Sequence, residues 1–159
     1  MTHYRQEVLD LAFKSLSALI DSHEIKDLSF ERFENPSTDE DFPQVRLMIM
    51  SDRGQRIQDG APRFSVSVDL GIWFAINFND SFVQDLNALS EKIESALLSN
   101  PDFINNFEFV ESFENEIDIN TLGETILASC MLVYTLVFNQ TYPPKLSNIL
   151  SDIVPAPEE

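Results

Sequence analysis

Side chains that commonly carry out chemistry are sparse in this 159-residue sequence, apart from carboxylates. Two histidines, His3 and His23, flank a predicted N-terminal helix, and neither has cysteine or aspartate at a spacing typical of a metal site. Cys130, the single cysteine, lies among apolar residues, which favours a buried thiol over a nucleophile. The sequence contains no glycine-rich phosphate loop and no nucleophile elbow. We therefore expect no enzyme activity, no catalytic residue, no cofactor and no metal site.

Carboxylates gather between residues 108 and 118. In the stretch EFVESFENEID the alternation predicts one acidic strand face, formed by Glu108, Glu114, Glu116 and Asp118. The other face is predicted to carry Phe107, Phe109, Phe113, Ile117 and Ile119. Paired carboxylates could serve a hydrolase, but a solvated face explains the same pattern, and no nucleophile accompanies the acids. Hydrolysis is therefore the least supported of the functions considered.

Arginines gather in a second stretch, SDRGQRIQDGAPR, which spans residues 51–63. Its glycines and proline predict a connection between two strands. Arg53, Arg56 and Arg63 are three of only ten basic residues in the chain. Such a loop could simply be exposed, could contact an acidic surface of another subunit, or could bind an anion.

The formal net charge is −17. Binding to phosphates needs lysine and arginine, so this charge opposes nucleic-acid binding and no sequence-specific contact with nucleic acid is expected. No apolar run approaches the roughly 20 residues of a membrane helix, so no membrane partner is expected. A single cysteine fits a reducing cytoplasm.

Hydrophobic periodicity predicts the elements that position these groups. Amphipathic helices are expected over 3–22 and 79–102, because apolar residues recur there every three or four positions. Strands are expected within 26–34 and over 44–50, 65–78, 106–119 and 125–142, with a polar loop at 35–43. The final stretch again shows helical spacing, at Leu146, Ile149, Leu150, Ile153 and Val154.

These elements predict an α+β fold: a mixed, mainly antiparallel sheet with two amphipathic helices packed on one face. Residues 1–142 would form a single domain and residues 143–159 a C-terminal tail, which could dock on its own domain or on a partner. The helix-free face should be partly exposed around Trp73 and Ala75, with Met48 and Met50 nearby. An exposed apolar patch of this kind usually binds a partner.

The order of elements resembles the tail terminator proteins of long-tailed phages and prophages, the family of small proteins like the minor tail protein U of phage lambda. The resemblance covers residues 1–142 and is strongest from Asp85 to Phe138. In that segment the helix VQDLNALSEKIESAL ends in the turn NPDF, and an acidic strand leads through a GE turn into GETILASCMLVYTLVF.

The resemblance implies a structural virion protein without enzyme activity that forms a homo-oligomer, a hexameric ring. Such a ring caps the tail tube, ends polymerisation of the tube protein and offers a surface to a head-completion protein. The protein would be assembled in the host cytoplasm and reside in the virion tail. From the residues themselves we expect subunit or tube contacts at Arg53, Arg56, Arg63 and Trp73; the basic character of the 51–63 stretch and the tail after Pro143 depart from the family pattern. Acidic side chains would face a DNA channel, with Glu111, Glu114, Glu116 and Asp118 as candidates.

One alternative is a monomeric module that binds a small ligand or a peptide. A sheet with helices on one face can cradle a ligand, and 13 phenylalanines could line a pocket. A native mass of about six copies in solution would favour the assembly protein. A monomer with a ligand in its pocket would favour the binding module.

Overall fold

The computed structural model describes residues 3–30, 42–58, 63–122 and 125–141. Within these ranges the chain forms three helices and five strands: α1 (Tyr4–Asp21), β1 (Asp27–Phe30), β2 (Gln44–Gln58), β3 (Arg63–Asn77), α2 (Phe82–Leu98), α3 (Pro101–Ile104), β4 (Phe109–Leu122) and β5 (Thr125–Thr141). The predicted helices and strands are all present, with shifted ends. The predicted tail at 143–159 and most of the predicted 35–43 loop lie outside the described residues.

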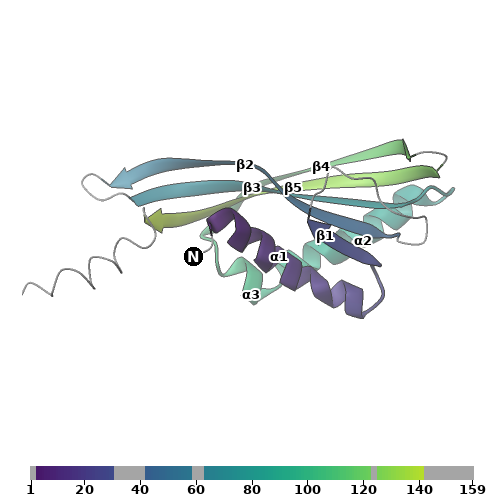
Figure 1. Cartoon of the computed structure of the whole chain (residues 1–159), viewed down its shortest axis with the longest axis horizontal. Coiled ribbons are helices and arrows are strands. Elements are labelled where there is room, and N and C mark those ends of the chain that lie inside the picture. The colour runs from purple at the N-terminus through teal and green to yellow at the C-terminus, as the bar shows by residue number, and fades with distance from the viewer. Residues whose placement is uncertain (1–2, 31–41, 59–62, 123–124, 142–159) are drawn as a thin grey trace, which may run out of the picture.

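The strands form one sheet in the order β1-β2-β3-β5-β4. β1 pairs with β2 in parallel, and every other neighbouring pair is antiparallel. Figure 1 shows the helices on the same side of the sheet, beneath the long strands. The predicted α+β class, with a mixed and mostly antiparallel sheet and helices packed against it, is therefore confirmed. We call the covered side the helix face and the opposite side the outer face.

β3 supplies the centre of the core because its apolar residues alternate with small or polar ones. Its helix face carries six buried side chains: Val66, Val68, Leu70, Ile72, Phe74 and Ile76. The register sets Ile72 beside Leu132 and Leu70 beside Tyr134 on β5. The helices complete this core with buried side chains from α1 (Val8, Ala12, Leu16 and Leu19) and from α2 (Leu86, Leu89, Ile93 and Leu97).

The two histidines lie at the ends of a helix rather than in a chemical site. His3 is the N-cap of α1, where its Nδ1 accepts a hydrogen bond from the backbone N–H of Arg5 at 3.1 Å. His23 follows the helix with φ of 63°, a left-handed conformation typical of helix C-termini. The backbone N–H of Glu24 then donates to the carbonyl of Leu19 at 2.9 Å. Both positions thus serve the ends of α1.

The predicted connection over 51–63 is wrong for most of its length. β2 continues to Gln58 and pairs with β3 from Gln44↔Ala75 to Gln58↔Arg63. The backbone of β3 offers hydrogen-bond partners along its full length, so β2 stays extended after its side chains become polar. The result is a long hairpin that runs past the helices (Figure 1).

The outer face is partly covered by the chain itself. Phe42 packs against Ala75 and Leu127, and Trp73 lies against this small cluster. Next to it, Met48 and Met50 lie over Gly71. A Cβ added to that glycine would come within 2.9 Å of Met48 Cγ and of Met50 Sδ. Trp73, Met48 and Met50 therefore do share the outer face as predicted; Trp73 and Met48 are half-buried, whereas Met50 is 51% exposed.

Two adjacent leucines at the end of α2 offer a test of which side of that helix faces the core. Leu97 is fully buried and Leu98 is 37% exposed. Replacing Leu97 by Ala should lower the free energy of unfolding by roughly 2 to 5 kcal/mol, because it leaves a cavity. The matched Leu98→Ala change should cost less than about 1 kcal/mol. Urea unfolding of both variants measures the difference, and equal losses would contradict the described packing of α2.

Candidate interaction surfaces

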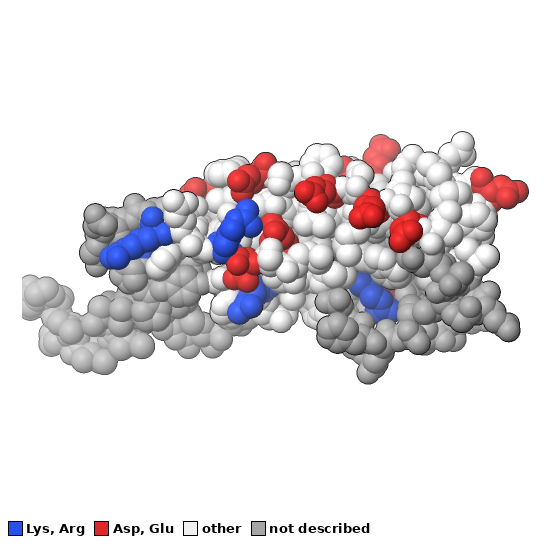
Figure 2. Space-filling model, turned by 90° about the horizontal axis from the view of Figure 1, so that it is seen from above, with Lys and Arg blue, Asp and Glu red and all other residues white. Residues whose placement is uncertain are grey.

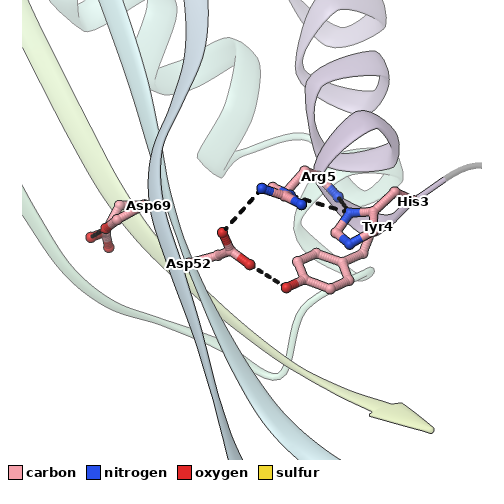
Figure 3. Close-up of polar contacts among 6 residues, drawn as sticks. His3, Tyr4, Arg5, Asp52 and Asp69 are labelled. Carbon is pink, nitrogen blue, oxygen red and sulfur yellow. Dashed lines mark hydrogen bonds and ion pairs between the residues drawn. The ribbon is translucent and has the colours of Figure 1, made fainter. Parts of the chain in front are cut away.

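The arginine hairpin, meaning residues 51–58 of β2 with the start of β3 at Arg63, is anchored to α1 on the helix face. Asp52 accepts a hydrogen bond from the Tyr4 hydroxyl, and Arg5 Nη1 lies 3.7 Å from Asp52 Oδ1. Figure 3 shows Asp52 turned toward the first turn of α1, with Asp69 on the opposite side of the strands. The base of the hairpin is therefore held by the N-terminal turn of α1.

A polar network on the outer face holds the same hairpin from the other side. Arg53 lies 3.6 Å from Asp69 Oδ2 and 3.7 Å from Glu111 Oε2. Asp69 also accepts hydrogen bonds from Ser51 at 2.6 Å and from Thr135 at 2.7 Å. These contacts join β2, β3, β5 and β4. Arg53 is thus engaged within its own chain, although its side chain is 59% exposed.

Asp69 is the centre of this network. Burial by itself raises the pKa of Asp69, but the hydrogen bonds from Ser51 and Thr135 and the positive charge of Arg53 outweigh burial, so the pKa is lowered. Our sequence reasoning did not single out this residue. A signal was available, because Asp69 is the only charged residue in the alternating stretch 65–78.

The other two arginines of the hairpin do not join this network in the same way. Arg56 pairs in register with Phe64, and Arg63 pairs with Thr141. Strand alternation places Arg53 and Arg63 on the outer face and Arg56 on the opposite side. Arg56 and Arg63 are both exposed. The three predicted contact residues therefore share one hairpin without forming a single flat patch.

The four predicted channel-facing acids lie together, and we call them the acidic row: Glu111, Glu114, Glu116 and Asp118. The register opposes Glu114 to Val133, Glu116 to Met131 and Asp118 to Ser129, all on the outer face. Figure 2 shows acidic side chains following one another across that face. Glu111 occupies the position where the β4–β5 register shifts, and it contacts Arg53. All four side chains are exposed.

The same register shift corrects one sequence-based prediction. Phe109 was expected to share a face with Phe113, but Phe109 pairs with Val137 on the outer face and Phe113 pairs with Tyr134 on the helix face. An extra residue at Glu111 forms a bulge, which reverses the alternation. Phe107, also expected on that face, precedes β4, and its ring packs at a tilt against those of Phe103 and Phe138.

Four exposed apolar side chains gather on the helix face, while Met50 and Phe109, 51% and 52% exposed, lie on the outer face. We call this group the apolar wing, and it comprises Phe113, Ile117, Ile119 and Ile126, which are 43% to 56% exposed. α1 packs mainly over β1, β2 and β3, and α2 over β3 and β5. β4 lies at the sheet edge beyond them. Trp73, by contrast, is half-buried against its own cluster.

A groove separates α2 from β4 beside the apolar wing. Its volume is about 420 Å³, and its lining includes Glu91, Glu94, Leu98, Ile117 and Cys130. Burial raises the pKa of the Cys130 thiol, so the thiol stays protonated at neutral pH. Burial also raises the pKa of Tyr134, and the nearby charge of Glu94 adds to that effect. The groove thus combines three apolar side chains, Leu98, Ile117 and Cys130, with polar and acidic ones, and the Cys130 thiol is not activated.

Comparisons with known proteins add no assignment: no family model matches the sequence, and no curated protein matches it. In the described ranges, histidine, cysteine and carboxylate side chains do not gather in threes close enough to hold a metal ion. None of the helices that the structure describes is both long and apolar enough to span a membrane.

Asp69→Asn tests the network on the outer face. At neutral pH the variant should lose roughly 1 to 2 kcal/mol of unfolding free energy, because hydrogen bonds to a charged acceptor are weakened. A lowered pKa contributes stability above about pH 4 and loses it as the pH falls through the folded value. The gap between wild type and variant should therefore shrink in acid.

Unfolding measured from pH 7 to pH 2 checks this expectation. Asp118→Asn is the matched control, since Asp118 is exposed on the same face and, within the part of the chain that the structure describes, accepts a hydrogen bond from the adjacent N–H of Ile119. That change should stay within about 0.5 kcal/mol. A pH-independent gap for Asp69→Asn would show that its charge is not what stabilises the network.

Proposed function

We propose that this protein is a structural assembly protein that acts as a closed ring of identical subunits capping the tail tube of a phage or prophage. The observation that carries the proposal is the placement of two unlike surfaces far apart on one subunit. The arginine hairpin extends from one end of the sheet, and the apolar wing lies on β4 and the start of β5, toward the other end. Ring closure needs such a heterologous pair of patches.

The exposed edge of the sheet gives further support. Among the described residues β4 is an edge strand of 14 residues, with exposed apolar side chains on the helix face and Phe109 exposed on the outer face. An exposed edge of this length is a site for association unless charge or a bulge protects it. Here the acidic row and the Glu111 bulge oppose uncontrolled pairing. These features fit an edge that meets a specific neighbour.

The charge distribution fits a ring through which DNA passes. The acidic row lies on one face and the chain carries a net charge of −17. A channel lined with carboxylates would repel phosphates, so DNA would pass without adhering. In this proposal the acidic row faces the channel, and the tube protein and a head-completion protein bind the two ends of the ring.

The α2–β4 groove keeps a second candidate open, a monomeric module that binds a small ligand or peptide. A volume of about 420 Å³ suits a small ligand. Much of the lining is polar, however, including Asn87, Ser90 and Asn115. Ligand pockets are usually mainly apolar with few polar groups, so this candidate ranks second.

Native mass spectrometry of the full chain, alone and with the tube protein from the same genome, tests the proposal. We expect a mass of about six subunits and, by electron microscopy, added density at one end of each tube. Tubes grown with the protein should be shorter than tubes grown without it. A monomer under both conditions that leaves tube length unchanged would contradict the ring.

The combined change Arg53→Ser, Arg56→Ser and Arg63→Ser should abolish capping while the fold survives, because exposed ion pairs each contribute only about 0 to 1 kcal/mol. Circular dichroism checks the fold and tube length checks the function. Lys14→Ser with Lys26→Ser is the control, since both lysines are exposed and lie outside the hairpin. Equal tube lengths with wild type and with the arginine variant would show that the arginines of the hairpin are not needed for docking.

A further inference from the structure

We propose that residues 145–154 of one copy dock as an amphipathic helix on the apolar wing and in the adjoining α2–β4 groove of a neighbouring copy. The inference rests on the proposed self-association and specifies one of its contacts. It assigns an occupant to a surface that the described residues leave exposed, and it gives a role to the C-terminal segment.

The receiving surface joins a group of exposed apolar side chains to a groove whose lining is largely polar. Phe113, Ile117, Ile119 and Ile126 are 56%, 43%, 49% and 46% exposed, which leaves large apolar side chains in contact with solvent. Ile117 also lines the groove, so the wing and the groove are continuous. Leu98 extends the apolar surface onto α2 and is 37% exposed. A contiguous apolar surface of this kind is typical of a binding site.

The sequence of the segment matches helix-in-groove recognition. Its apolar positions fall at i, i+3, i+4, i+7 and i+8, namely Leu146, Ile149, Leu150, Ile153 and Val154. This spacing gives one apolar stripe on a helix. Asn148 falls on the opposite side of that helix. A pair of prolines, Pro143 and Pro144, precedes the segment and favours the start of a helix.

Distance along β5 identifies the donor as another copy. β5 runs from Thr125 to Thr141, and Cys130 in the groove lies 11 residues before its end. At about 3.3 Å per residue this is roughly 36 Å, and Ile126 is roughly 50 Å away. Leu146 lies at most about 18 Å from Thr141 even with an extended connection. A helix from 146 to 154 adds only about 12 Å.

A helix tethered to its own Thr141 therefore reaches Phe113, whose partner Tyr134 lies about 23 Å before Thr141, but ends short of Ile117, Ile119 and Ile126. The apolar wing lies toward the β4–β5 turn, whereas β5 ends beside the arginine hairpin (Figure 1). In the proposed ring the end of one subunit's β5 would lie next to the following subunit, so a neighbour's segment would cover the part of the wing and groove that its own chain does not reach. Each interface would then include one donated helix.

Disulfide trapping between separately purified single-cysteine variants tests the inference. In a Cys130→Ala background, Ile117→Cys is mixed with Ile149→Cys under mild oxidation, and products are resolved on a non-reducing gel. We expect a heterodimer that forms at least tenfold faster than with either of two matched controls. The first control pairs Ile117→Cys with Asn148→Cys. The second pairs Ile149→Cys with Glu116→Cys, which lies on the outer face of β4.

If Cys130→Ala does not fold, the same pairs are made with Cys130 retained, because burial keeps that thiol unreactive, and peptide mapping identifies the linked residues. Native mass is recorded for each sample. A ring in which positions 117 and 149 are not linked in mixed samples would overturn the donated helix and leave the ring intact. A link between copies without a ring would support the donated helix and overturn the ring. A double variant that carries both Ile117→Cys and Ile149→Cys in one chain is oxidised in parallel. If its disulfide forms only within one chain and the mixed single variants form none, the inference is overturned.

Discussion

The structure depends on the pairing of β3 with both of its neighbours along most of its length. β3 pairs with β2 from Arg63 to Ala75 and with β5 from Arg63 to Asn77, so most of its backbone hydrogen-bonding groups are satisfied within the sheet. Its alternation then commits every second side chain between Val66 and Ile76, all of them apolar, to the helix face. This one strand fixes where α1 and α2 pack and keeps β2 extended after its sequence turns polar.

The helices do not cover the full width of the sheet. They pack mainly over β1, β2, β3 and β5, and β4 lies beyond them at the edge. Apolar side chains on the helix face of β4 therefore remain in solvent, although they follow the same alternation as the core. The apolar wing is exposed because the helices leave β4 uncovered. The arginine hairpin is exposed because the β2–β3 hairpin extends beyond the helices. Both features present surface at positions where the subunit has no described element to cover it.

Much of the fold could be predicted from the sequence, because α1, α2 and β3 have strong periodicity and their apolar residues are those of the core. The acidic row was also predictable, since alternation alone assigns Glu114, Glu116 and Asp118 to one face. The extent of β2 was not, because a polar stretch paired to a long strand resembles a loop. Nor could alternation show that Phe113 and Ile117 stay exposed, since that depends on which strands the helices cover. Asp69 acquires its partners only through pairing of distant strands.

The bulge at Glu111 reverses which face of the sheet the odd-numbered side chains of β4 occupy. Before it, odd-numbered side chains such as Phe109 point to the outer face; after it, odd-numbered ones such as Phe113 and Ile117 point to the helix face. A single inserted residue thus separates carboxylates from aliphatic groups over the distal half of the strand. Gain or loss of one codon at this point would exchange the chemistry of the two sides at once, which makes the length of this short segment more constrained than its composition.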